Sequence, residues 1–373
     1  MTGRSTPPFR ADHVGSLLRP ARVHEAREKL ASGAITTADL RQVEDEAIRE
    51  VVDMQRGAGL RSATDGEFRR ATWHMDFIYQ LHGIGKSEEK LHVTFHNAAG
   101  DVDWEPAALR VHDRIGLDGT IFGEDFAFLK SIVEPGITPK QTIPSPSMVY
   151  YRGGRKAVSE EVYPDLEDFY TDLAAAYARE IANMAELGCT YLQMDDTSLA
   201  YLNDPEQRAL VASMGGDPDK QHVRNIRTMN AALADKPEGM TITTHLCRGN
   251  FRSSWVASGG YDFVADALFN DLNVDGYFLE FDDERSGGFE PLRFVPKGKY
   301  VVLGLVTTKR GQLESVDELR RRIDAAAKFV DLDQLCLSGQ CGFSSTEEGN
   351  TLTQDEQKAK LERIVETAQL VWG

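Results

Sequence analysis

The chain has 373 residues, of which 41% are hydrophobic and 27% charged, the balance of a water-soluble globular protein. Its formal net charge of −17 argues against nucleic acid or an anionic membrane surface as a partner. The four cysteines lie far apart, no apolar run approaches the ~18 residues of a membrane span, and the N-terminal MTGRSTPPFRAD does not resemble a signal peptide, so we expect a reduced, cytoplasmic protein.

Strand and helix patterns alternate through most of the chain. Apolar and β-branched runs predict eight strands, which span residues 9–16, 60–67, 141–147, 190–196, 240–247, 276–282, 300–306 and 334–341. Apolar positions at helical spacing predict helices over residues 36–57, 165–187, 218–234, 315–329 and 353–370, with a shorter one over 261–269. Thr36 or Thr37 is expected to cap the first helix.

Residues 83–116 interrupt this alternation. Within them, segments 92–95 and 109–114 predict two strands that pair with each other as a β-hairpin inserted after the second main strand. Eight strands with interleaved helices, and no long linker rich in Gly, Pro or Ser, predict one α/β domain over residues 1–373. The expected fold is a single (β/α)8 TIM barrel that carries this insertion.

The fifth strand ends in the sequence HLC. Side chains at positions i and i+2 of a strand point to the same side, so His245 and Cys247 are expected to project together. A histidine nitrogen beside a cysteine sulfur is part of a typical zinc site, although a polar strand end with a packed cysteine would give the same pattern. Cys189 and Cys336 are expected to be buried packing residues, as most free cysteines are.

Two further residues complete a candidate ligand set for Zn²⁺. Cys341 follows the eighth strand between two glycines, and Glu280 is a carboxylate inside an apolar strand, where it needs a cation, a metal or a proton. In a (β/α)8 barrel the carboxyl ends of the strands surround one mouth. The polar residues expected at those ends are Ser16, Glu67, Asp195, His245, Cys247, Glu280 and Cys341.

Several of these motifs resemble the cobalamin-independent methionine synthase family, specifically its C-terminal catalytic barrel. They are HLC in strand five, Glu280 followed by D-x-x-R-S-G in strand six, and GQCG in strand eight. HVGS, DGE and LQMDD match further family positions in the same order, over nearly the whole chain. Long members carry a second, N-terminal barrel that is not seen here. The resemblance implies that His245, Cys247, Glu280 and Cys341 hold zinc.

The resemblance also implies the substrates, which are homocysteine as the small-molecule thiol and an alkyl donor. Ser16, Glu67 and Asp195 would bind the amino acid part of homocysteine, with the two carboxylates on its ammonium group. A zinc-bound thiol becomes a thiolate that can take the methyl group, which gives methionine. The residues alone leave alternatives open, because Asp195 or Asp196 could cap a helix and Glu67 could form a surface salt bridge with one of the next two arginines.

The chain departs from the family at two places that concern the donor. The family histidine of an H-S-P sequence after strand seven is absent, and the sequence there is VTTKR, which offers Lys309 as the catalytic candidate. The tryptophan expected near a pterin after strand three is not evident, and QTIPSPSMVYY offers Tyr150 and Tyr151 instead. Lys309 could equally be a solvated loop residue. The donor therefore stays open among folate, corrinoid, sulfonium and epoxide.

Two other functions compete with methionine synthesis. The first is a zinc-dependent thiol alkyltransferase of the epoxyalkane:coenzyme M transferase type, whose sulfonate-bearing thiol would need cations such as Arg248, Arg252 and Lys309. The second is a non-catalytic zinc-binding barrel with a closed metal site. The acids Glu67 and Asp195 favour an amino acid thiol, hence homocysteine. The sequence does not decide whether the chain forms a homo-oligomer.

Overall fold

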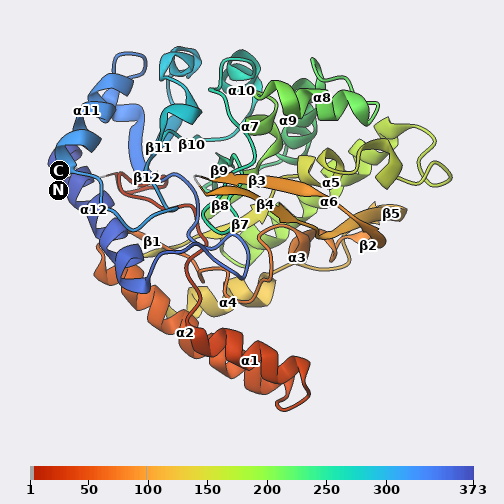
Figure 1. Cartoon of the computed structure of the whole chain (residues 1–373), viewed down its shortest axis with the longest axis horizontal. Coiled ribbons are helices and arrows are strands. Elements are labelled where there is room, and N and C mark those ends of the chain that lie inside the picture. The colour runs from red at the N-terminus through yellow and green to blue at the C-terminus, as the bar shows by residue number, and fades with distance from the viewer. Residues whose placement is uncertain (1–3, 98) are drawn as a thin grey trace.

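Six parallel strands form one continuous sheet in the computed structural model, which describes residues 4–97 and 99–373 (Figure 1). The sheet runs in the order β12 (Leu335–Gly339), β11 (Tyr300–Val306), β10 (Gly276–Glu280), β9 (Thr241–Leu246), β8 (Tyr191–Asp196) and β7 (Gln141–Pro144). Next to β7, β6 (Thr138–Pro139) pairs in parallel with β1 (Ser62–Ala63). Segment 10–17 closes the ring, since Leu337 N donates to Arg10 O (2.9 Å) and Leu17 N donates to Gly66 O (3.0 Å). The eight predicted strands thus form the predicted (β/α)8 barrel.

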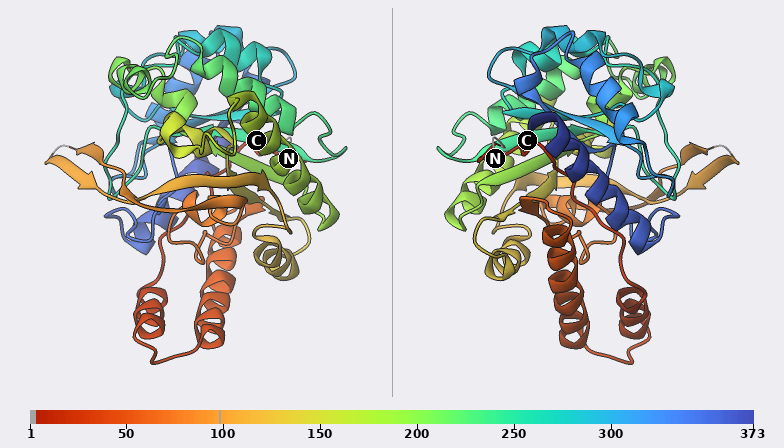
Figure 2. Two further views of the ribbon diagram at one scale, coloured as in Figure 1. Left: turned by 90° about the vertical axis from the view of Figure 1, so that its right-hand side faces the viewer. Right: turned by 90° about the vertical axis from the view of Figure 1, so that its left-hand side faces the viewer.

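Helices cover the outside of the ring (Figure 1). The predicted helices are present as α2 (Thr37–Gly57), α6 (Leu166–Glu186), α9 (Gln221–Ala232), α10 (Ala265–Asp271), α11 (Val316–Ala326) and α12 (Gln354–Trp372). Six α-helices of the described chain were not predicted: α1 (Ala21–Ala31), α3 (Met75–Ile78), α4 (Gly123–Ile132), α5 (Ser147–Tyr151), α7 (Ser198–Tyr201) and α8 (Pro205–Ser213). Figure 2 shows α1 beside α2, projecting together from the barrel. α1 buries only Val23 and Ala26, and so few apolar positions leave little helical pattern to read.

The structure was also searched for a helix that could cross a membrane. Among residues 4–97 and 99–373, no helix combines the length and the apolarity that a membrane span requires.

The first turn of α2 has a capping box at Thr36, which decides between the two predicted caps. Thr36 Oγ1 accepts from Asp39 N (3.2 Å), and Asp39 Oδ2 accepts from Thr36 N (2.8 Å). We expect Thr36→Ala to lower the free energy of unfolding by about 1 kcal/mol, measured by urea denaturation. The matched control is Thr37→Ala, inside the helix, which should change stability by less than about 0.5 kcal/mol. Equal losses in both proteins would contradict the role of the cap.

The insertion is more elaborate than the predicted hairpin. The strand β2 (His82–Lys90) pairs antiparallel with β5 (Ala107–Gly116), and β3 (Val93–Asn97) pairs antiparallel with β4 (Gly100–Trp104). Segments 92–95 and 109–114 are therefore strands, but the prediction that they pair with each other was wrong. The chain turns back between β3 and β4, so a short hairpin is nested inside the longer one. Two backbone hydrogen bonds between His96 and Trp255 (2.6 and 2.9 Å) fix β3 to the loop that follows β9.

A buried polar cluster fills the barrel near the beginnings of its strands. Lys140 Nζ lies 3.4 Å from Asp12 Oδ1 and donates to His13 O (2.5 Å), while Tyr191 Oη donates to Asp12 Oδ2 (2.8 Å). These groups satisfy one another, which offsets the cost of burying a charge pair. The opposite end of the barrel, where the strands finish, is where the predicted site residues lie.

Candidate metal centre and active-site cavity

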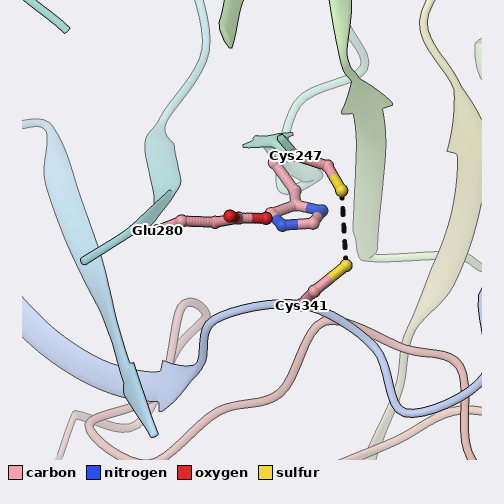
Figure 3. Close-up of side chains that lie close together, drawn as sticks. Cys247, Glu280 and Cys341 are labelled. Atoms are coloured by element: carbon pink, nitrogen blue, oxygen red, sulfur yellow. Dashed lines mark hydrogen bonds between the residues drawn. The ribbon is translucent and has the colours of Figure 1, made fainter. Parts of the chain in front are cut away.

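Four metal-ligating side chains converge at the carboxyl ends of β9, β10 and β12. One donor atom from each of His245, Cys247, Glu280 and Cys341 lies within 4.8 Å of those of the other three. Figure 3 shows the thiols of Cys247 and Cys341 facing each other, with the Glu280 carboxylate directed toward the same region. All four side chains are buried. The structure therefore brings together the complete set that the sequence proposed for zinc.

The Glu280 carboxylate has an unused acceptor inside the protein. Its Oε1 accepts from Arg248 N (3.1 Å), whereas Oε2 is buried and has no hydrogen-bond partner among the described residues. A buried carboxylate oxygen without a partner is costly unless a cation binds it. Two thiols, an imidazole and a carboxylate at this spacing match the donors that zinc prefers. The residues present therefore fit a zinc ion.

The two thiols are coupled to each other. The sulfur atoms of Cys247 and Cys341 are 3.4 Å apart. Donation of the Cys247 S–H to Cys341, together with burial, raises the pKa of Cys247 well above its ordinary value. The same hydrogen bond, helped by the charge of His245 and opposed by burial, lowers the pKa of Cys341. Cys341 is thus the thiol that loses its proton first.

His245 lies in a strongly negative environment. Its Nδ1 is 3.1 Å from Asp195 Oδ1, and its Nε2 is 3.2 Å from Gln340 O. Burial disfavours the charged imidazolium, but the hydrogen bond to Asp195 and the negative charge of Cys341 and Glu280 outweigh it and raise the pKa of His245 to about 9. The field that stabilises this proton would equally stabilise a metal cation.

Lys309 is not a solvated loop residue. Its Nζ is buried and has no hydrogen-bond partner among residues 4–97 and 99–373. It lies close enough to the thiols that its positive charge favours the thiolate, which acts to lower the pKa of both Cys247 and Cys341. Lys309 is not among the residues that line the cavity with Cys247 and Cys341. Its catalytic role stays a prediction.

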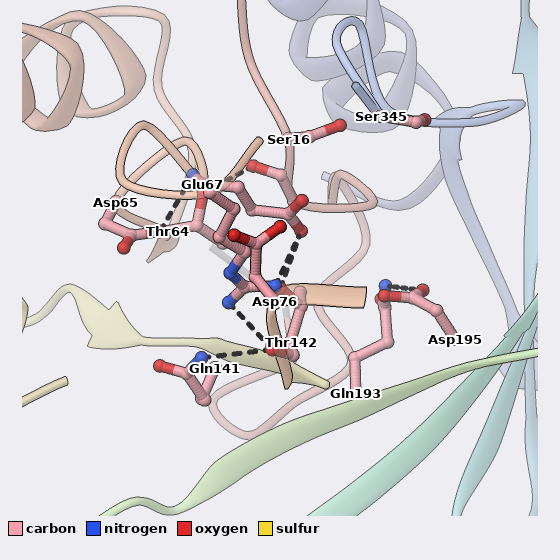
Figure 4. A network of polar contacts seen from close by, with 12 residues as sticks. Ser16, Thr64, Asp65, Glu67, Asp76, Gln141, Thr142, Gln193, Asp195 and Ser345 are labelled. Carbon is pink, nitrogen blue, oxygen red and sulfur yellow. Dashed lines mark hydrogen bonds and ion pairs between the residues drawn. The ribbon is translucent and has the colours of Figure 1, made fainter. Parts of the chain in front are cut away.

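Ser16, Glu67 and Asp195 line the same cavity as His245, Cys247 and Cys341, whereas Glu280 does not line it. Figure 4 shows the side chains of Ser16, Glu67 and Asp195. The salt bridge considered from the sequence is present, since Glu67 pairs with Arg70, but Glu67 is only 3% exposed, so the pair is buried and not at the surface. Its Oε1 accepts from Thr142 Oγ1 (2.7 Å) and lies 3.5 Å from Arg70, while Oε2 is buried without a partner in the described chain. Burial raises the pKa of Glu67, and Arg70 opposes this shift.

The backbone at Glu67 is also unusual. Its φ is 62°, in the left-handed region that residues with a Cβ seldom adopt. Such conformations cost energy and concentrate at functional sites, where the surrounding structure holds them in place. Here Glu67 N donates to Asp65 Oδ1 (2.8 Å), which helps to fix the turn. The turn directs the carboxylate into the cavity.

The two aspartates at the end of β8 have different environments. Asp196 accepts from Leu199 N (2.8 Å) and from three serine hydroxyls, so it stabilises the start of α7 (Ser198–Tyr201). Asp195 uses Oδ1 for Gln193 Nε2 (2.7 Å) and for His245. Its Oδ2 accepts no hydrogen bond from the described residues, and Asp195 lines the cavity. The helix-capping alternative therefore holds for Asp196, and Asp195 stays available to a ligand.

The space above the metal-ligating residues, counted together with the open solvent at its mouth, is about 570 Å³. Among the lining residues that the sequence did not single out are Trp73, His74, Phe95, Trp104, Arg152 and Tyr201. Phe95 and Trp104 belong to the nested hairpin and pack on Phe251, with ring centroids 5.2 and 5.7 Å away. The insertion therefore supplies an aromatic wall to the cavity. Only the partial alternation of apolar residues in β3 and β4 could have indicated this role.

Neither of the two arginines considered as partners for a sulfonate-bearing thiol is placed to bind it. Arg248 is fully buried, and its guanidinium donates to Gly259 O (3.0 Å), Gly260 O (3.1 Å) and Tyr261 Oη (2.8 Å). These donors hold the loop after β9 and are not free for a substrate. Arg252 is exposed and does not line the cavity.

Other residues from the sequence analysis lie away from the cavity. Cys189 is 2% exposed and Cys336 is 0% exposed, and neither belongs to the metal-ligating group. Both are buried, as expected for cysteines that serve in packing. Tyr150 and Tyr151, the proposed substitutes for a family tryptophan, line a separate small pocket. Trp73 and Trp104 are the tryptophans that reach the cavity, and they come from other loops.

Comparison with known proteins identifies the family. The profile described as "Cobalamin-independent synthase, Catalytic domain" matches residues 138–370, more than half of the chain. The chain belongs to the cobalamin-independent methionine synthase family. The uncharacterized protein YxjH of Bacillus subtilis (strain 168) is 47% identical to it over 98% of this chain and 95% of its own length. The methionine synthase of Pyrococcus abyssi is 26% identical over 88% of this chain and 85% of its own length.

Solved structures of cobalamin-independent methionine synthases have the same fold. A structure from Listeria monocytogenes, assigned to the vitamin-B12 independent methionine synthases, is 37% identical, covers 99% of both chains and has a TM-score of 0.78. A B12-independent methionine synthase from Shewanella sp. W3-18-1 is 19% identical over 97% of both chains, with a TM-score of 0.72. The sequence resemblance to this family of methyltransferases, and the barrel fold it implied, are therefore confirmed.

Proposed function

We propose that this chain is a zinc-dependent methyltransferase that moves a methyl group to the thiol of homocysteine to give methionine. The observation that carries the proposal is one cavity lined by three members of the His-Cys-Glu-Cys group, His245, Cys247 and Cys341, and by the acids Glu67 and Asp195. A metal centre alone would serve many reactions. The added pair of buried carboxylates suits the ammonium group of an amino acid thiol.

The four metal-ligating residues would bind the metal ion that activates the substrate thiol. His245, Cys247, Glu280 and Cys341 would hold the ion, and its contribution when bound is to keep the substrate thiol deprotonated at neutral pH. Asp195 would keep the proton on one imidazole nitrogen, as acidic partners of ligand histidines commonly do. Two thiolates and a carboxylate give the group net negative charge. Glu280, the hardest donor, is the residue we expect to give up its place to the substrate sulfur.

Lys309 is the candidate catalytic residue on the donor side. Its buried, unpartnered ammonium lies near Cys247 and Cys341, so it could bind an anionic group or hold a proton beside the leaving group. Its position in the sequence is that of the family histidine after strand seven. We therefore assign the donor step to Lys309 and leave the identity of the donor to assay.

Replacement of Asp195 tests the recognition of the amino acid. Asn keeps an oxygen that can accept from His245 and Gln193 but removes the negative charge. We expect Asp195→Asn to lower kcat/KM for homocysteine by at least tenfold, because loss of a buried charge partner costs about 2–5 kcal/mol. Zinc content should not change. Mercaptoethanol, a thiol without an ammonium group, is the control, and an equal loss of its binding would show that Asp195 is structural instead.

Titration of the zinc-loaded protein with homocysteine and with coenzyme M tests the proposal directly. Homocysteine should release a proton on binding and change the zinc X-ray absorption edge, because its sulfur becomes a ligand. Coenzyme M should do neither, since its sulfonate would share the cavity with the carboxylates of Glu67 and Asp195, which repel it, and the guanidinium of Arg248 is already bound to carbonyl and hydroxyl oxygens. Binding of coenzyme M alone would favour the epoxyalkane:coenzyme M transferase alternative. Binding of neither thiol would favour the non-catalytic barrel.

Three further expectations accompany the proposal. Residues 1–373 are proposed to act as one catalytic unit, with the insertion as part of its active site. The cytoplasm is the expected location, and small molecules are the expected partners. Whether the chain forms a homo-oligomer stays a prediction for sedimentation measurements.

A further inference from the structure

Arg152 is an unpaired cation on the wall of the active-site cavity. It follows α5 (Ser147–Tyr151), after the third barrel strand, and lines the cavity. Its Nε is buried, and none of its nitrogen atoms has a hydrogen bond or an ion pair with the described residues. The chain contains 59 acidic residues, so an arginine without an acidic partner stands out. A guanidinium carries five N–H donors whose fork geometry matches carboxylate and phosphate oxygens.

His74 lies next to Arg152 on the same wall. It is 4% exposed, its Nδ1 is buried without a partner in the described chain, and its ring stacks on Trp73 with centroids 4.4 Å apart. Burial and the nearby charge of Arg152 lower the pKa of His74 to about 3. The imidazole is thus neutral at physiological pH and has one N–H to donate. An arginine and a neutral histidine together offer donors, but no negative charge, to a ligand.

The loop that carries His74 is held rigidly beside the metal-ligating residues. Trp73 N donates to Ser345 O (2.9 Å), and Thr72 pairs with Thr346 in an antiparallel bridge. Ser345 and Thr346 belong to the loop that follows β12, and the same loop carries Cys341. Arg152 is only partly buried, whereas the metal-ligating residues and the two acids are buried, so Arg152 lies nearer the cavity mouth. An alkyl donor that enters the cavity to reach the thiol would share the cavity with Arg152 and His74.

We propose that Arg152 and His74 form a subsite that binds an oxyanion, a carboxylate or a phosphate, carried by the alkyl donor. This inference rests on the proposed function, in which Glu67 and Asp195 take the thiol substrate. The two buried nitrogen atoms without partners are the reason for assigning a ligand to this wall. The lack of any acid paired with Arg152 is the reason for assigning it a negative charge.

The first test measures binding of inorganic phosphate to the zinc-loaded, homocysteine-bound protein by calorimetry at constant ionic strength. We expect saturable binding that Arg152→Gln weakens about tenfold or more, since charge-assisted hydrogen bonds are lost. Arg155→Gln is the matched control, because Arg155 contacts Glu160 and Tyr163 O and does not line the cavity. Absence of phosphate binding to the wild-type protein, or equal binding to Arg152→Gln, would overturn the subsite.

Homocysteine binding to the same variants separates this inference from the proposed function. Arg152→Gln should leave the proton release and the zinc-edge change caused by homocysteine intact. If the variant loses homocysteine instead, Arg152 binds the carboxylate of the thiol substrate and the assignment to the donor is wrong. If the wild-type protein does not bind homocysteine, the proposed function fails, and phosphate titration of the zinc-loaded protein without homocysteine still reports on the oxyanion subsite.

A second test identifies the source of the oxyanion. Values of kcat/KM are compared for methyltetrahydrofolate, which has carboxylates, methylcobalamin, which has a phosphate, and trimethylsulfonium, which has no anionic group. Arg152→Gln should lose tenfold or more with the anionic donor that the enzyme uses and keep its rate with trimethylsulfonium. A loss with methyltetrahydrofolate would identify the bound group as a carboxylate, and a loss with methylcobalamin would identify it as a phosphate. An equal loss with trimethylsulfonium would contradict the proposal.

Discussion

We expect the Cys341→Ser protein to contain almost no zinc and to show no methyl transfer, while the wild-type protein contains about one zinc per chain. Cys341 is the thiol with the lowered pKa and therefore the more readily available thiolate. Without it, Cys247 and Glu280 remain buried with too few partners to hold a cation. Metal analysis of the purified protein and a homocysteine methylation assay measure both effects. Cys247→Ser should behave in the same way.

Cys189→Ser is the control for this experiment. Cys189 is as buried as Cys341 but lies outside the metal-ligating group, so its replacement should leave zinc content and activity unchanged. Retention of full zinc content in Cys341→Ser would show that the four residues do not hold the metal together. Loss of zinc in Cys189→Ser would point to general damage to the barrel instead.

The second large effect concerns the methyl donor. Transfer from methyltetrahydrofolate needs a proton for a poor amine leaving group, and a well-placed general acid contributes about 10²–10⁴ in rate. This chain lacks the histidine that the family resemblance leads us to expect after strand seven and has Lys309 in that neighbourhood, and an ammonium is a weaker acid than an imidazolium. We therefore expect slow or absent turnover with methyltetrahydrofolate. Transfer from a methyl-cobalt corrinoid or a sulfonium, which have better leaving groups, should be faster.

Parallel assays of the zinc enzyme with homocysteine and each donor measure this difference, with Lys309→Ala as the variant. Loss of activity in Lys309→Ala should be largest for the donor that the enzyme uses best. Efficient turnover with methyltetrahydrofolate, undiminished in Lys309→Ala, would show that another residue delivers the proton. In that case the sequence around strand seven has been misinterpreted.

The sequence alone determined the barrel and the residues of the metal-ligating group. Strand alternation has a period of two, so HLC places His245 and Cys247 on one side regardless of what surrounds the strand. The topology of a (β/α)8 barrel then brings the ends of strands five, six and eight to one mouth, which is why Glu280 and Cys341 could be added before any distance was known. These inferences depend on local geometry and chain order.

The tertiary structure decided everything that depends on burial and on contacts between distant segments. The sequence left open whether Lys309 and Glu67 are surface residues or active-site residues. Only the folded structure shows that Lys309 Nζ and Glu67 Oε2 are buried and have no hydrogen-bond partner among the described residues. Arg152 and His74 belong to no sequence motif, and they become notable only because neither has an acidic partner among residues 4–97 and 99–373. The nested pairing of the insertion was also beyond the sequence, since neighbouring antiparallel segments can pair in more than one register with similar local patterns.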